Sequence, residues 1–73
     1  MLEEITKIVE NYIDLSSPLT EDMSLRGDLG MSSLDLINIA VEIEDTYDIA
    51  LPDDELNKMS TVKDLITYIS SNK

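Results

Sequence analysis

The sequence predicts an all-α fold: a small four-helix bundle of three main helices and one short helix, with a long loop between helices I and II. Apolar residues recur at helical spacing in three separate segments. No stretch of useful length alternates between apolar and polar residues as a half-buried strand does. With 73 residues the chain is long enough for one core, and we therefore expect a single domain, 1–73.

Composition and charge restrict the class of protein. The chain has no cysteine and no histidine, so it has no disulfide, no ordinary zinc site and no thiol or imidazole for catalysis. It also lacks a cationic-then-apolar leader and an apolar run of about 18 residues, which favours a cytoplasmic protein without stable membrane association. Sixteen acidic residues against five basic ones give a net charge of −11. This charge argues against nucleic acid as a ligand and favours partners with basic patches.

The first helix is expected over residues 2–14, where one face carries the apolar residues Leu2, Ile5, Val9, Tyr12 and Ile13. The periodicity then fails from residue 15 to about 32, where Ser16-Ser17-Pro18 ends the helix and Gly27 and Gly30 favour turns. A loop of this length in a small domain is usually functional or well packed. We expect an ordered strap, held over the core by Leu19, Met23, Leu25, Leu29 and Met31.

The second helix is expected to begin at Ser32-Ser33-Leu34-Asp35. A hydroxyl followed by an acid three residues later fits a capping box, with Ser32 as the cap and Ser33 as the first helical residue. At that first position a phosphate attached to the Ser33 oxygen is stabilised by the helix dipole and by free backbone N–H groups. The alternative is that both serines only cap the helix, and the four residues alone favour that alternative.

Residues 34–48 carry two apolar strips when they are placed at about 100° per residue. The broader strip, the expected core face, consists of Leu36, Ile39, Ala40, Ile43 and Tyr47. The second strip consists of Leu34, Ile37 and Val41. The acids beside this second strip are Asp35, Glu42 and Asp45 on one flank and Glu44 and Asp48 on the other. An exposed apolar strip between acids suits a basic partner, whereas the alternative is that the bundle buries both strips.

The remaining elements follow in order. Residues 49–52 are expected to be extended, because the residue before a proline disfavours the helical region. Residues 53–56 favour a short helix with Leu56 and Met59 inward, and residues 70–73 are expected to fray. The closing helix should begin at a second hydroxyl-to-acid cap, formed by Thr61 and Asp64, and its buried stripe consists of Val62, Leu65, Ile66 and Ile69.

These segments resemble the acyl carrier proteins over essentially the whole chain. The resemblance is carried by DLGMSSLD at residues 28–35, EDTYDI at residues 44–49 and LPD at residues 51–53. It implies that Ser33 bears 4′-phosphopantetheine through a phosphodiester, attached by a phosphopantetheinyl transferase. The arm's thiol would hold acyl intermediates as thioesters for fatty-acid, polyketide or related biosynthetic enzymes. The protein would be a carrier and not an enzyme, with no catalytic residue and no metal site.

The protein is expected to be a monomer, and its partners are expected to dock on the second helix (helix II), which runs from Ser33 through residues 34–48. They would be the transferase and the acyl-transferring and synthase enzymes, each with a basic docking patch. The expected docking residues are Leu34, Asp35, Ile37, Val41, Glu42, Glu44, Asp45 and Asp48. We also expect helices II and III to part and admit an acyl chain, because the predicted core is aliphatic and has a small side chain at Ala40.

Three positions depart from the family pattern. Ser32 replaces the usual aspartate, Asn38 replaces a common acid, and Arg26 stands where an apolar residue is frequent. These departures bear on which transferase and synthase surfaces fit, and they are compatible with a carrier dedicated to one pathway. The Gly-Gly-x-Ser pattern of peptidyl carriers is absent, which favours acyl over aminoacyl cargo. Two other functions stay open: an unmodified acidic helical adaptor and a small serine hydrolase.

Overall fold

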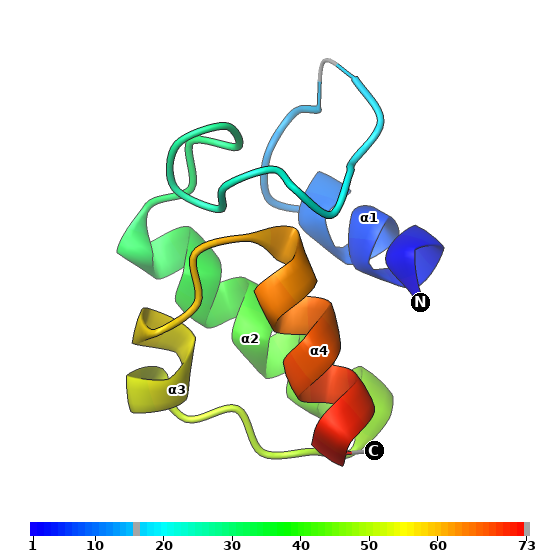
Figure 1. Ribbon diagram of the computed structural model, residues 1–73, viewed down its shortest axis with the longest axis vertical. Coiled ribbons are helices and arrows are strands. Elements are labelled where there is room, and N and C mark those ends of the chain that lie inside the picture. The colour runs from blue at the N-terminus through cyan, green and yellow to red at the C-terminus, as the bar shows by residue number, and fades with distance from the viewer. Residues whose placement is uncertain (16, 73) are drawn as a thin grey trace.

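The computed structural model describes residues 1–15 and 17–72, and in them the chain forms four helices (Figure 1). They are α1 (Leu2–Glu10), α2 (Ser33–Tyr47), α3 (Asp53–Asn57) and α4 (Val62–Asn72). These described residues contain no strand, and one isolated antiparallel bridge joins Ser24 to Thr61. The predicted all-α bundle, with its long loop between the first two main helices, is confirmed. No helix in the described part of the chain combines the length and apolar character needed to cross a membrane.

The core is a single cluster of buried apolar side chains from all four helices and the segments between them. Ile5 of α1, Ile43 of α2 and Ile69 of α4 have no exposed surface. The predicted core face of α2 is confirmed, although Tyr47 at its end is only partly buried. The fold therefore depends on burying one face of each helix, which contributes about 25 cal/mol per Å² of apolar area.

The first helix ends earlier than predicted. The pattern predicted a helix over residues 2–14, but α1 ends at Glu10. The N–H groups of Asn11 and Tyr12 donate to carbonyl oxygens three residues back, at 3.2 and 3.0 Å, which tightens the last turn. Their side chains then donate to the carboxylate of Glu42 on α2, at 3.3 and 3.2 Å. Tyr12, predicted on the core face, is consequently 37% exposed.

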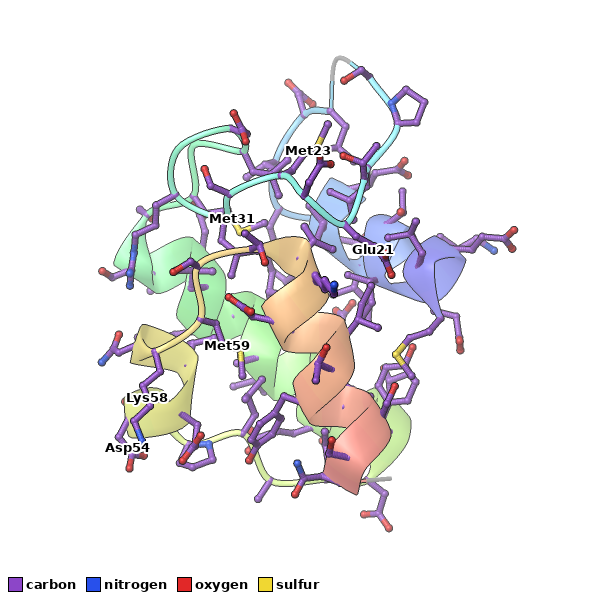
Figure 2. The ribbon with its side chains drawn as sticks, in the orientation of Figure 1. Glu21, Met23, Met31, Asp54, Lys58 and Met59 are labelled. Atoms are coloured by element: carbon purple, nitrogen blue, oxygen red, sulfur yellow. The ribbon has the colours of Figure 1, made fainter. Side chains whose placement is uncertain are left out.

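The loop between α1 and α2 is the ordered strap that the sequence predicted (Figure 1). Its apolar side chains are buried at Leu19, Leu25 and Met31 and partly buried at Met23 and Leu29. Figure 2 shows Met31 of the loop and Met59 before α4, both of which are buried in the core. Ser16, the first of the three residues expected to end the first helix, lies outside the described residues.

Backbone hydrogen bonds fix the loop to the start of α4. The N–H of Leu25 donates to the Ser60 carbonyl at 2.9 Å, and the N–H of Val62 donates to the Met23 carbonyl at 3.0 Å. These two bonds flank the Ser24–Thr61 bridge. The pairing satisfies backbone groups that a buried loop would otherwise leave without partners.

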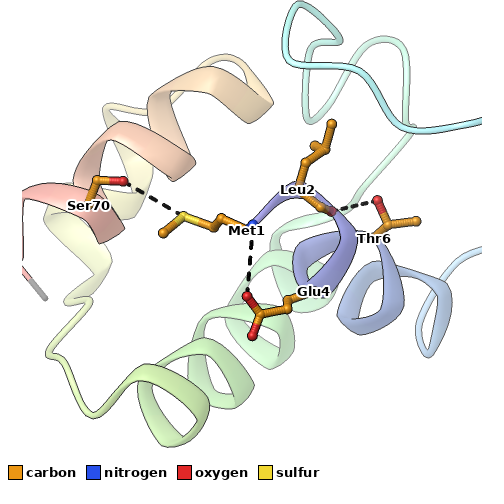
Figure 3. A network of polar contacts seen from close by, with 5 residues as sticks. All are labelled: Met1, Leu2, Glu4, Thr6 and Ser70. Atoms are coloured by element: carbon orange, nitrogen blue, oxygen red, sulfur yellow. Dashed lines mark hydrogen bonds and ion pairs between the residues drawn. The ribbon is translucent and has the colours of Figure 1, made fainter.

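The closing helix is longer at its C-terminal end than predicted. Residues 70–73 were expected to fray, yet α4 continues through Asn72, whose side-chain amide donates to the Tyr68 carbonyl at 2.8 Å. The Ser70 hydroxyl also donates to the Met1 sulfur at 3.8 Å, which joins the two ends of the chain (Figure 3). Lys73 lies outside the described residues.

The N-terminus of α4 is held by a charged cap. The N–H groups of Ser60 and Thr61 donate to Asp64 Oδ2 at 2.9 and 3.1 Å, and they hold the pKa of Asp64 below its usual value of 3.8. The predicted cap is confirmed, because the N–H of Asp64 also donates to the Thr61 hydroxyl at 3.3 Å. Since the pKa is lower in the folded state, the carboxylate contributes stability that is present above pH about 4 and lost as the pH falls through the folded-state pKa.

Replacing Asp64 with Ala is therefore expected to lower the melting temperature at pH 7. The difference from the wild type should shrink as the pH falls from about 4 toward 2, because the wild-type carboxylate then becomes protonated. Melting by circular dichroism across this range measures the effect. Asp54→Ala removes the same charge from an exposed side chain with no hydrogen bond among the described residues, and it is the control. A difference for Asp64→Ala that persists unchanged at pH 2 would contradict the assignment.

Candidate functional site

The last part of the loop is a compact turn that leads directly into α2. The N–H of Ser24 donates to Asp28 Oδ2 at 2.9 Å, and the N–H of Asp28 donates to the Ser24 hydroxyl at 2.8 Å. A Cβ on Gly27 would collide with that hydroxyl, so this position requires glycine as the turn stands. Gly30 has a φ of +65°, a region that favours glycine. The turn therefore fixes the direction from which the chain enters α2.

The N-terminus of α2 forms the predicted capping box. The N–H of Asp35 donates to the Ser32 hydroxyl at 3.2 Å, and the N–H of Ser32 donates to Asp35 Oδ2 at 3.1 Å. Ser33 is the first residue of the helix, as predicted, and it is exposed. Within residues 1–15 and 17–72 the Ser33 hydroxyl makes no hydrogen bond, and no side-chain base contacts it. The exposed hydroxyl therefore has no hydrogen-bonded base among the described side chains, whereas such a base is what activates a catalytic serine.

The second apolar strip of α2 lies on the surface. The exposed fractions are 66% for Leu34, 41% for Ile37 and 52% for Val41. The alternative that the bundle buries both strips is wrong, because the core contacts only the strip that includes Leu36 and Ile43. Exposed large apolar side chains in a row are typical of an interaction surface.

The acids beside this strip differ in how freely they are presented. Asp45 and Asp48 are exposed, and Asp48 ends α2 in the left-handed conformation at a φ of 56°. Glu42 accepts hydrogen bonds from the two residues after α1, whereas Glu44 Oε2 accepts the N–H of Leu51 at 2.8 Å. Asp35 belongs to the capping box. The structure thus brings all the predicted docking residues onto α2 and its end, and three of the acids also hold the fold together.

A pocket of about 210 Å³ opens beside Ser33, between α2 and α3. It is lined by Arg26, Ser33, Leu36, Ile37, Asp53, Leu56 and Asn57. Ala40, where we expected room for an acyl chain, does not line it. The sequence indicated Arg26 only as a departure from the family pattern, and it did not indicate Asn57. The two residues are 31 positions apart in the chain and meet only because α3 packs on α2.

The chain is similar to known carrier proteins over nearly its whole length. The family described as phosphopantetheine attachment site matches residues 3–69. An acyl carrier protein of Zymomonas mobilis is 36% identical over 72 residues, which cover 97% of this chain and 92% of that protein. The Mycobacterium tuberculosis protein Rv0033, assigned as an acyl carrier protein, aligns with a TM-score of 0.86 at 29% identity over 94% of this chain and 93% of that chain.

A third similar chain comes from a structure described by its synthase proteins and not as an acyl carrier protein. A chain in the solved structure of the ishigamide ketosynthase/chain length factor aligns with a TM-score of 0.75 at 28% identity. The alignment covers 97% of this chain and 90% of that chain. Because each of the individual proteins and chains is covered to nine-tenths or more, the similarity belongs to the whole helical domain and not to a short motif.

Substitutions of the two adjacent serines are expected to differ in their effect on stability. Ser32→Ala removes the cap of α2 and is expected to lower the free energy of unfolding by about 1 kcal/mol, within a usual range of about 0.5–2 kcal/mol. Ser33→Ala is the matched control and is expected to change stability little, because its hydroxyl makes no hydrogen bond among the described residues. Urea denaturation measures both values. Equal losses for the two variants would contradict the capping assignment.

Proposed function

Because the chain belongs to the acyl carrier protein family and contains its phosphopantetheine attachment domain, we propose that Ser33 is the residue that bears the 4′-phosphopantetheine group. The observation that carries the proposal is the exposed Ser33 hydroxyl, without a hydrogen-bond partner in the described residues, at the first position of α2. Ser32 beside it is occupied by the capping box. The site fits a phosphate ester, since backbone N–H groups and the helix dipole there stabilise negative charge.

The chemistry of the carrier is divided between the group and the chain. When bound, the group supplies a thiol that holds an acyl chain as a thioester, which this cysteine-free chain cannot supply itself. Ser33 Oγ would accept the phosphopantetheinyl group of coenzyme A: the new P–O bond forms as the pyrophosphate bond breaks, and adenosine 3′,5′-bisphosphate leaves. The transferase must provide the base that takes the serine proton, together with magnesium. The chain provides a fixed point of attachment and a recognition surface, and it is not itself an enzyme.

The partner surface is the exposed strip of α2 with its flanking acids. Leu34, Ile37 and Val41 supply apolar contact area. Asp45 and Asp48 are exposed, and their carboxylates make no hydrogen bond or ion pair within the described residues. Asp35, Glu42 and Glu44 add negative charge while bonded within the chain. We propose that a phosphopantetheinyl transferase and synthase enzymes with basic patches dock here, and the likeness to a chain in a ketosynthase/chain length factor structure supports synthase partners.

Loading of the unmodified protein tests the attachment residue. Incubation with coenzyme A, magnesium and a promiscuous phosphopantetheinyl transferase is expected to add one phosphopantetheine mass to the wild type and to Ser32→Ala, but none to Ser33→Ala. Intact-mass spectrometry with peptide mapping measures the gain and its position. Circular dichroism of Ser33→Ala confirms that the variant is folded.

The same experiment separates the other two functions. No mass gain in any form would favour an unmodified adaptor that uses α2 alone, and a gain on another residue would overturn the assignment of Ser33. Hydrolysis of a test ester by the purified chain, abolished in Ser33→Ala, would favour the serine hydrolase.

Two substitutions on α2 test the partner surface by surface plasmon resonance with the transferase. Asp45→Asn is expected to slow association roughly two- to fivefold and to weaken its salt dependence, because exposed charges act mainly on the encounter rate. Val41→Ser is expected to speed dissociation roughly two- to tenfold, because apolar contact is lost. Asp14→Asn removes an exposed acid outside α2 and is the control. Equal slowing by Asp14→Asn and Asp45→Asn would show that net charge, and not this surface, guides association.

A further inference from the structure

Arg26 is the only arginine in the chain, and it lines the pocket beside Ser33. None of the lysines that the structure describes, Lys7, Lys58 and Lys63, lines this pocket. A chain with sixteen acids thus places a permanent positive charge in the same pocket as the hydroxyl that, on the proposed function, receives a phosphate.

The guanidinium of Arg26 is not neutralised by an acid. Its Nη2 donates to Asn57 Oδ1 at 3.4 Å, and among the described residues it makes no ion pair with any carboxylate. Asp53 lines the same pocket but is not within ion-pair distance of Arg26. A guanidinium carries five N–H donors, so most of its donors remain available to an anion.

The turn that carries Arg26 is held on both sides. Ser24 and Asp28 exchange two hydrogen bonds around it, and the N–H of Leu25 is bound to the Ser60 carbonyl. The N–H of Met31, just before α2, also donates to the Leu25 carbonyl at 3.2 Å. The backbone next to Arg26 is therefore tied to the start of α4 and to the residues that lead into α2 before any group is attached. Fixing the backbone in advance lowers the entropy that a new contact would lose.

We propose that Arg26 is the counter-ion of the phosphodiester on Ser33 and directs the first part of the arm along the pocket between α2 and α3. This inference rests on the proposed attachment at Ser33. A planar guanidinium matches two phosphate oxygens at once, which makes it a better partner for this anion than a lysine. Asp53 is the acid that competes for Arg26, and Asn57 holds the guanidinium at the α3 side of the pocket. Arg26 is a positioning residue for the group.

Because Arg26 is the only arginine, its side chain can be observed without any substitution. In ¹⁵N-labelled wild type, loading is expected to move the Arg26 Nε–H resonance and to slow its exchange with water by at least about threefold, the range of a new charge-assisted hydrogen bond. Adding salt should reduce the change. Identical Arg26 resonances before and after loading would overturn the proposal.

The phosphorus nucleus gives the second readout. The ³¹P resonance of loaded Arg26→Gln is expected to differ from that of the loaded wild type and to approach that of a free phosphodiester, with Arg26→Lys in between. Asp53→Asn should shift it in the opposite direction, because the competing acid is gone. Lys7→Gln removes one positive charge on the exposed side of α1, outside the pocket, and should leave the resonance unchanged. Equal shifts in Arg26→Gln and Lys7→Gln would overturn the proposal.

Failure of this inference is distinguishable from failure of the attachment assignment. Mass spectrometry first confirms that each form carries the group on Ser33. A wild type that is not modified at Ser33 defeats both proposals. Suppose instead that the wild type is modified at Ser33, but loading leaves the Arg26 Nε–H resonance unchanged and Arg26→Gln leaves the ³¹P resonance unchanged. That result defeats the role of Arg26 alone.

Discussion

The reciprocal hydrogen bonds between Ser32 and Asp35 are the interaction on which the rest of the site depends. They determine that the helix begins at Ser33, and each later residue then has a fixed direction, since successive side chains turn by about 100°. With this register Leu36 enters the core and Leu34 faces outward. A shift by one residue would turn an exposed apolar residue inward and a core residue outward, so the cap decides which side chains of α2 are buried and which lie on the surface.

The loop before α2 serves the core and the site together. A chain of 73 residues has little apolar area to bury, and Leu19, Leu25 and Met31 contribute to the core from a segment without helix. Ordering this segment costs conformational entropy, which the buried side chains and the pairing with the start of α4 offset. The same pairing immobilises the turn around Arg26. The position of the site is consequently a product of core packing and not of the site residues alone.

The sequence predicted what depends on local chemistry. Caps at Ser32 and Thr61, the core stripe of α2 and the ordered loop follow from side chains within a few residues of one another, and these are confirmed. The end of α1 was predicted wrongly, because Tyr12 is apolar enough to continue the stripe while its hydroxyl finds Glu42 thirty residues away. The contact between Arg26 and Asn57 was not foreseen for the same reason. Periodicity reports which face is apolar, and it contains no information on which distant polar groups meet.

The charge of the molecule acts at two distances. Over the whole surface, a net charge of −11 favours encounter with basic partners and opposes the addition of a further anion. At physiological ionic strength, however, exposed charges are screened beyond about 8 Å, so groups next to Ser33 decide how an anion is received there. Those groups are the N–H donors at the start of α2 and the guanidinium of Arg26, against the single pocket acid Asp53. On the proposed function, the acids on the surface of α2 would act on a basic partner at close approach, and the groups around Ser33 would receive the anionic tether. Screening keeps the more distant acids from opposing that anion.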